Sequence, residues 1–260
     1  MKNVKMIVAT HKKYQMPDDD LYIPVHVGAE GKSDLGYQKD NAGENISLKN
    51  PYYCELTGLY WAWKNLDAEY VGLSHYRRYL KGTYKFNVNN KIKKIISSKD
   101  VDEILKKTDI ILPRKRKYYI ETLYSHYNHT MYIEPLDKTG EIIEKDYPEY
   151  LNEFKKLKTR RSAHMFNMFI MKKDKLNEYC TWLFDILDKL EQKVDVAQFD
   201  SFHARFYGRI SELLLDVWIN TKGYGYKEVK FVNIEKANWW MKGTSFLKAK
   251  FGKKKYGKSF

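Results

Sequence analysis

The chain of 260 residues is 43% hydrophobic and 15% aromatic, which excludes a disordered protein and allows one substantial core. The length fits one α/β domain with appendages better than two independent folds. A formal net charge of +14 indicates acidic partners, and nucleic acid, an anionic membrane surface and a phosphorylated substrate all satisfy that charge.

Strand and helix patterns alternate in the first third of the chain. The β-branched apolar run VKMIVAT (4–10) predicts a buried central strand. Asn50 and Pro51 predict the N-cap and first turn of a single helix that ends at residue 65 and carries apolar residues at helical spacing. The run YVGL (70–73) predicts the next strand.

The patterns are weaker in the middle of the chain and strong again after it. We predict helices over 101–107, 147–158, 174–190 and 211–221, and strands over 110–113 and 165–171. This alternation predicts an α/β fold with a mostly parallel central sheet flanked by helices. We expect one domain over 1–230 and a basic, aromatic tail over 231–260. Ligands of such sheets bind beyond the carboxyl ends of the strands.

The cysteines and apolar runs bear on the protein's surroundings. Cys54 and Cys180 lack CxxC or Cys/His spacing, which favours reduced packing cysteines in a cytosolic protein. The apolar run over 4–9 is too short for a signal-peptide core, and no run approaches the roughly 18 residues of a membrane helix. We expect a cytoplasmic location and only peripheral contact with the inner face of the cell membrane.

The most informative motif is YVGLSHYRRYL, in which a strand delivers His75, Tyr76, Arg77 and Arg78 to its carboxyl end. One planar guanidinium group can donate two parallel hydrogen bonds to phosphate oxygens, and it stays charged at every relevant pH. We therefore interpret these residues as a clamp for a diphosphate. The alternative is an exposed basic turn that pairs with surface carboxylates.

Carboxylates that could hold a divalent metal against a diphosphate are missing from this position. Asp18, Asp19 and Asp20 lie in the loop after the first strand, and Asp67 and Glu69 precede the second strand, at its other end. Solvated loop residues are the better interpretation of both groups. We expect no metal ligands, no permanently bound cofactor and no requirement for a divalent metal.

Five motifs together resemble a known family. In chain order they are ATHK, MP with VHVG, NISLKNPYYCELTGLYWAWKN, YVGLSHYRRYL and YGRISELLLDVWI. Over residues 6–219 the chain resembles a bacterial capsule and exopolysaccharide glycosyltransferase family long classed as a domain of unknown function. The resemblance implies a GT-A-like fold, a nucleotide-diphosphate sugar donor, expected to be UDP-linked, and in some members galactofuranosyl transfer.

The resemblance also assigns roles to single residues. Those implied to bind the donor are Thr10, His11, Lys12 and Asn45, in addition to the clamp residues. Those implied to contact the acceptor or the transferred sugar are His164, Asn167, Arg205 and Arg209. Packing is the competing interpretation of His164, and helix solubility that of Glu55, which matches the CELT motif. The family usually continues the last motif with an arginine where this chain has Leu213.

Transfer with inversion needs a general base that takes the proton of the acceptor hydroxyl, and a carboxylate is the usual choice. Glu212 is our candidate and Asp200 the second choice, because both belong to the stretch that leads into the last helix. An acid in a first helical turn also interacts favourably with the helix dipole, so a structural role explains either residue.

The tail from Lys236 onward contains eight lysines and no acid, with Trp239 and Trp240 among its aromatic residues. This composition favours an anchor on an anionic membrane, where a lipid-linked oligosaccharide acceptor would reside. A disordered basic tail is the alternative. A second function class, a basic nucleic-acid-binding protein without catalytic activity, fits the charge, but the chain has no recognised nucleic-acid motif, so we expect no nucleic-acid partner.

Overall fold

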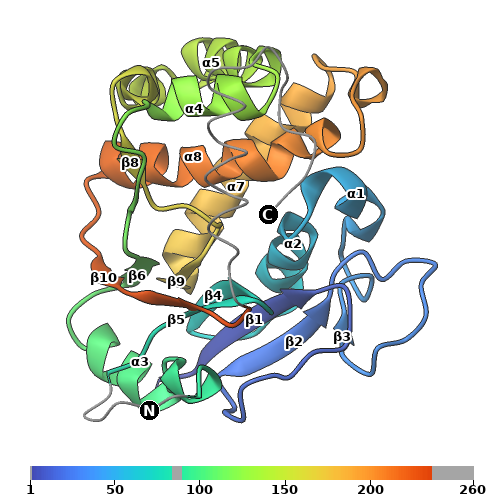
Figure 1. The fold of residues 1–260 in the computed structure, drawn as a ribbon, viewed down its shortest axis with the longest axis vertical. Coiled ribbons are helices and arrows are strands. Elements are labelled where there is room, and N and C mark those ends of the chain that lie inside the picture. Colours follow the sequence, from blue (N-terminus) through green and yellow to red (C-terminus); the bar gives the residue numbers. More distant parts are fainter. Residues whose placement is uncertain (1, 84–89, 236–260) are drawn as a thin grey trace.

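The computed structural model describes residues 2–83 and 90–235. Within them, one nine-stranded sheet is flanked by helices, so the predicted α/β class is confirmed (Figure 1). The strand order is β10-β6-β9-β4-β1-β2-β3, with β5 beside β4 and β11 beside β5. The strands are β1 Val4–Thr10, β2 Tyr22–His26, β3 Gln38–Lys39, β4 Tyr70–His75, β5 Arg78–Leu80, β6 Ile110–Pro113, β9 Phe169–Lys172, β10 Lys227–Val229 and β11 Phe231–Asn233.

The longest strand pairings are parallel. β1 lies between β2 and β4 and runs parallel to both, so the carboxyl ends of these three strands share one edge. β9 runs antiparallel between β4 and β6. Its amino end therefore lies at the edge where β4 ends, with Phe169 opposite Leu73. A separate two-stranded sheet pairs β7 (Arg116–Lys117) with β8 (Ser162–Ala163).

Helices cover both faces of the sheet (Figure 1). They are α1 Asn50–Tyr53, α2 Leu56–Asn65, α3 Ser98–Leu105, α4 Leu123–Thr130, α5 Glu134–Asp146, α6 Leu151–Lys155, α7 Lys173–Glu191 and α8 Phe206–Lys222. Short 3-10 helices occupy Ser47–Lys49, Ile92–Lys94, Pro148–Tyr150, Lys156–Lys158, Val196–Gln198 and His203–Arg205. None of the described helices is both long and apolar enough to span a membrane.

Alternate residues of β1 supply the two faces. Ile7 and Ala9 pack in the larger core with α2, α7 and α8, whereas Met6 and Val8 pack in the smaller core with α3. A strand buried on both faces must be apolar at every position, which explains the continuous apolar run in the sequence. The predicted strand over 4–10 is confirmed.

The single helix predicted over 51–65 is wrong. Cys54 has φ 55° and ψ −128°, which ends α1 after Tyr53, and α2 begins only at Leu56. Asn50 is not an N-cap either, because it is the first residue of α1 and its side chain donates forward to the carbonyl of Cys54 at 2.7 Å. Helical spacing continues across the break, so periodicity alone did not reveal it.

The strand predicted over 165–171 begins too early, because the observed strand β9 starts at Phe169. Phe166 and Asn167 have φ of 81° and 51°. Positive φ is incompatible with an extended strand, so the apolar run MFNMFIM divides into a turn and a short strand. The helix predicted over 147–158 is likewise three short helical pieces in succession.

The chain remains part of the sheet beyond residue 230. β11 pairs with β5 and places Val232 opposite Tyr79. The first residues that the sequence assigned to the tail therefore belong to the domain. The rest of that predicted tail, from residue 236, lies outside the described residues.

The buried carboxylate of Asp40 fixes the junction between β2 and the first two helices. It accepts hydrogen bonds from the amides of Gly28 (2.7 Å) and Ala29 (3.0 Å) and from the hydroxyls of Ser47 (2.5 Å) and Thr57 (2.6 Å). Asp40 is fully buried, and without it the amides of Gly28 and Ala29 and the hydroxyl of Ser47 would lose this acceptor. The NIS and CELT motifs thus share a structural role.

We expect Asp40→Asn to lower the free energy of unfolding by about 2–3 kcal/mol, because an amide loses the charge and offers donors where the site holds only donors. Urea denaturation measures the change. Asp67→Asn, at an exposed side chain, serves as the control. Equal unfolding midpoints for the two variants would refute the anchoring role of Asp40.

Candidate functional site

The site lies where β4 ends and the chain turns into β9. His75, the last residue of β4, is 3.2 Å through its Nε2 atom from the carbonyl oxygen of Phe166. A carbonyl only accepts, so Nε2 carries the proton of this hydrogen bond. The pairing of β4 with β9 brings these two residues together across 91 positions of sequence.

Glu55 connects this edge to the break between α1 and α2. Its Oε1 atom accepts a hydrogen bond from Nδ2 of Asn167 at 2.7 Å and lies 3.6 Å from Nε2 of His75. The Glu55 side chain is 12% exposed. Sequence reasoning missed this residue as a site member, although the CELT motif contained it.

Asn167 in turn is held by α8. Its Nδ2 atom also donates to the carbonyl of Gly208 at 3.1 Å, and its Oδ1 atom accepts from the hydroxyl of Ser211 at 2.7 Å. Asn167 is buried, so these bonds satisfy its amide and fix its direction. The structure therefore brings the predicted residues Asn167 and His75 together through Glu55.

Backbone strain is concentrated around Glu55. Of the four described non-glycine residues with positive φ, three are Cys54, Phe166 and Asn167. Such conformations cost roughly 1–3 kcal/mol each and persist where surrounding contacts hold them, commonly at functional sites. The fourth, Tyr119, lies elsewhere in the chain.

Glu212 is the second carboxylate of the site. It is 6% exposed on α8 and lies 3.5 Å from Nη1 of Arg209. Burial lowers the pKa of Arg209, but the charges of Glu212 and Glu55 more than offset this effect and raise it. The guanidinium therefore stays charged beside the Glu212 carboxylate.

Arg78, the first residue of β5, lies against the turn before β9. Its guanidinium lies 3.7 Å from the ring centre of Phe166, and its Nε atom donates to Oδ1 of Asn233 at 3.0 Å. Burial, with the like charges of Arg77 and Arg116, lowers the pKa of Arg78 to about 10, while Glu212 acts in the opposite direction. Arg78 remains protonated at neutral pH.

Arg77 belongs to a different group of side chains. It lies 5.3 Å from the ring centre of Tyr76, which Lys12 approaches at 5.2 Å and His11 at 5.4 Å. The carboxylate of Glu235 pairs with both cations, at 3.5 Å from Arg77 and 4.0 Å from Lys12. The predicted clamp of adjacent arginines is thus divided between two basic groups.

Four further predicted residues have other contacts. Thr10 accepts from the amide of Lys12 and shapes the loop after β1, and exposed Asn45 bonds the backbone of its own loop. Asp200 caps the 3-10 helix at His203 and hydrogen-bonds the ring of that histidine at 2.6 Å. Arg205 donates to Sγ of Cys54 at 3.0 Å, and Cys54 is the residue of strained backbone conformation that precedes Glu55.

His164 is fully buried between two carboxylates. Its Nδ1 atom hydrogen-bonds Asp216, its amide donates to the same carboxylate at 2.9 Å, and its Nε2 atom lies 2.9 Å from Glu228. Burial raises the pKa of Asp216, but the bonds to His164 outweigh it and lower the pKa overall. Both ring nitrogens of His164 are therefore occupied by protein partners.

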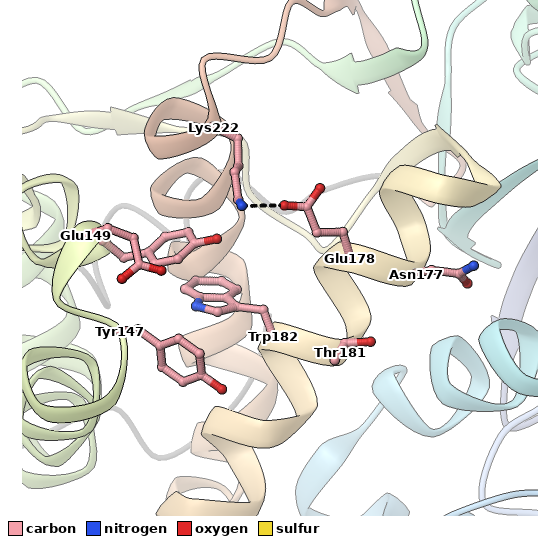
Figure 2. Close-up of a pocket in the computed structure, with 8 residues that line it drawn as sticks. Tyr147, Glu149, Asn177, Glu178, Thr181, Trp182 and Lys222 are labelled. Atoms are coloured by element: carbon pink, nitrogen blue, oxygen red, sulfur yellow. Dashed lines mark ion pairs between the residues drawn. The ribbon is translucent and has the colours of Figure 1, made fainter.

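In the parts of the chain that the structure describes, no group of three or more His, Cys, Asp or Glu side chains could hold a metal ion. A surface groove of about 390 Å³ lies away from the predicted site, between α7, the end of α8 and the 3-10 helix before α6 (Figure 2). Its lining is Tyr147, Glu149, Tyr150, Asn177, Glu178, Thr181, Trp182 and Lys222, and Figure 2 shows the Lys222–Glu178 ion pair that crosses it. It contains none of the predicted site residues.

We expect His164→Ala to lower the free energy of unfolding by about 3 kcal/mol, because buried Asp216 would lose its imidazole partner and keep only the backbone amide of residue 164. Ligand binding at the Glu55 site should be unchanged. Chemical denaturation measures the first effect and calorimetry the second. As a control, Glu228→Gln, at a side chain that is 35% exposed, should cost at most about 1 kcal/mol. Intact stability with lost ligand binding would make His164 a binding residue instead.

Comparisons with known proteins agree with this architecture. The chain matches no curated protein. It is similar to the WbbM bifunctional glycosyltransferase in its apo structure, with a TM-score of 0.83, 31% sequence identity and 90% of this chain covered. The match takes in 46% of that chain, so our chain spans less than half of its length. The family described as a domain of unknown function, DUF4422, matches residues 5–223, and the chain therefore belongs to this family.

Proposed function

We propose that this chain is a glycosyltransferase that moves a sugar from a nucleotide-diphosphate donor to an acceptor hydroxyl. The observation that carries the proposal is that two carboxylates, Glu55 beside His75 at the end of β4 and Glu212 paired with Arg209 on α8, act electrostatically on both Arg78 and Arg209. Glycosyl transfer needs both charges, since a proton is removed from one reactant while a negative diphosphate leaves the other. The similarity to a bifunctional glycosyltransferase supports it.

The donor diphosphate would bind between the two basic groups. Lys12 and Arg77 already hold one anion, the carboxylate of Glu235, which a diphosphate would replace. Arg78 lies on the side of the carboxylates and would neutralise the charge of the leaving group. In this proposal the arginines supply the positive charge, and no divalent metal held by the protein is required.

Glu212 would act as the general base. Its carboxylate takes the proton of the acceptor hydroxyl while that oxygen forms a bond to the anomeric carbon. The bond between this carbon and the diphosphate oxygen breaks, and its electron pair leaves with the diphosphate. In Asp200, the alternative base, one carboxylate oxygen accepts a hydrogen bond from the amide of Phe202 and the other is hydrogen-bonded to the ring of His203. Glu212 is therefore the better candidate.

The finer assignments follow from the family resemblance. We propose a UDP-linked donor sugar, with galactofuranose as the first candidate, and a lipid-linked oligosaccharide acceptor in capsule or surface polysaccharide synthesis. Such an acceptor resides at the cytoplasmic face of the cell membrane, so the protein would work there.

Two variants should separate binding from chemistry. Arg77→Ala should weaken binding of uridine diphosphate about tenfold, because one charge-assisted contact is lost. Glu212→Gln should bind the nucleotide normally but lose about 10²–10⁴ in transfer rate. Calorimetry and a transfer assay with a panel of donor sugars measure both.

A wild-type protein that binds oligonucleotides more tightly than every nucleoside diphosphate would refute the proposed function. Near-normal transfer by Glu212→Gln would remove only Glu212 from the mechanism. Restoration of chelator-inhibited turnover by manganese or magnesium would overturn the metal-independent part of the proposal.

We also propose that the tail after Glu235 attaches the protein to anionic membranes. Its eight lysines and its aromatic residues carry this proposal, since a lysine near an anionic surface contributes about 1 kcal/mol. The full chain should sediment with anionic liposomes, and salt should release it. A truncation after Glu235 should stay in solution, and neutral liposomes are the control. Equal sedimentation of the two proteins would show that the tail is not the anchor.

A further inference from the structure

We propose that Glu55 is a catalytic residue whose carboxylate stabilises the positive charge that develops on the transferred sugar. This inference rests on the proposed function, and it concerns a residue that the base mechanism does not use. When the bond to the diphosphate breaks, electron density leaves the anomeric carbon, and the sugar ring acquires oxocarbenium-ion character. A fixed negative charge beside the ring lowers the energy of that state.

The contacts of Glu55 leave part of its carboxylate available. Asn167 and His75 both approach Oε1, whereas Oε2 makes no hydrogen bond with any described residue. The side chain is partly exposed, so a ligand can reach this second oxygen. A carboxylate present only for helix solubility would point outward and would not be held by a buried amide.

The position of Glu55 is fixed before any substrate binds. Asn167, which donates to it, is held by Gly208 and Ser211 on α8. The strained residues Cys54 and Asn167 set the direction of Glu55 and of its donor. Charges that stabilise a transition state act best when they need no rearrangement during the reaction, and strain maintained by surrounding contacts provides such rigidity.

The two carboxylates of the site differ in their partners. Glu212 lies against the guanidinium of Arg209, which balances its charge. Glu55 has a neutral amide and an imidazole as direct partners, and the arginines act on it from farther away. Glu55 therefore keeps more of its negative charge for a ligand, and this assigns it to the cationic sugar and Glu212 to the acceptor proton.

The test uses binding of a cation and needs no turnover. A furanose-sized iminosugar with a pyrrolidine ring, protonated at neutral pH, imitates the charge of the reacting ring, and the matching anhydro sugar is its neutral counterpart. We expect the full-length wild type to prefer the cation about tenfold by calorimetry, with and without uridine diphosphate. Glu55→Gln, which keeps an oxygen for the Asn167 bond, should lose this preference while its nucleotide affinity stays unchanged.

Glu69→Gln is the matched control, because Glu69 is exposed and lies at the amino end of β4, at the opposite edge of the sheet. It should retain the wild-type preference. Equal preference for the cation in wild type and Glu55→Gln, or no preference in wild type, would overturn the role of Glu55. A wild type that prefers the cation but binds no nucleoside diphosphate would overturn the proposed donor and leave Glu55 supported.

Discussion

The hydrogen bond from Asn167 to Glu55 connects three parts of the chain that the sequence keeps far apart. It ties the break between α1 and α2 to the turn before β9, and Asn167 extends the connection to α8. The first two of these segments are irregular where they meet, since Cys54, Phe166 and Asn167 all have positive φ, whereas α8 is regular helix there. The regular sheet supports this edge, and the irregular residues determine where its polar groups point.

Charge is distributed unevenly over this edge. The charges of Glu55 and Glu212 act on Arg78 and Arg209, whereas Arg77 and Lys12 gather around Tyr76 and, among the carboxylates that the structure describes, pair with that of Glu235. One region therefore has nearly balanced charge, and its neighbour has a surplus of positive charge. Because buried charges are stable only with partners, the first suits a neutral or transiently cationic group and the second suits an anion.

Composition and periodicity predicted the class of the fold, the central strand over 4–10 and the long helices near the end of the chain. They did not predict β2, whose run YIPVH is short and contains a proline, or α4, whose sequence LYSHYNHT has little apolar pattern. The breaks at Cys54 and Asn167 were missed for a different reason. Their conformations depend on contacts with distant segments, and the tolerance of asparagine for positive φ was too weak a local signal to predict the break at Asn167.

The site was predictable to the extent that strand ends indicate function. The sequence named His75, Asn167, Arg209 and Glu212 as candidates. In the structure His75 and Asn167 contact Glu55, while Arg209 pairs with Glu212. Arg77 and Arg78 are adjacent in the sequence but belong to separate groups of side chains. Sequence could not predict this separation, because the direction of each side chain depends on where β5 begins. Glu55 itself resembled an ordinary helix-surface acid, and only its contacts distinguish it.

The pairing of β5 with β11 determines when the site can form during translation of the chain. Arg78 is made early, but its partner Asn233 and the strand that supports it come more than 150 residues later. A nascent chain that has not yet released residues 231–234 from the ribosome lacks one wall of the site, although the central strands have already been synthesised. The arginine therefore reaches its final position only when synthesis of the domain is nearly complete, and a growing chain carries no finished site.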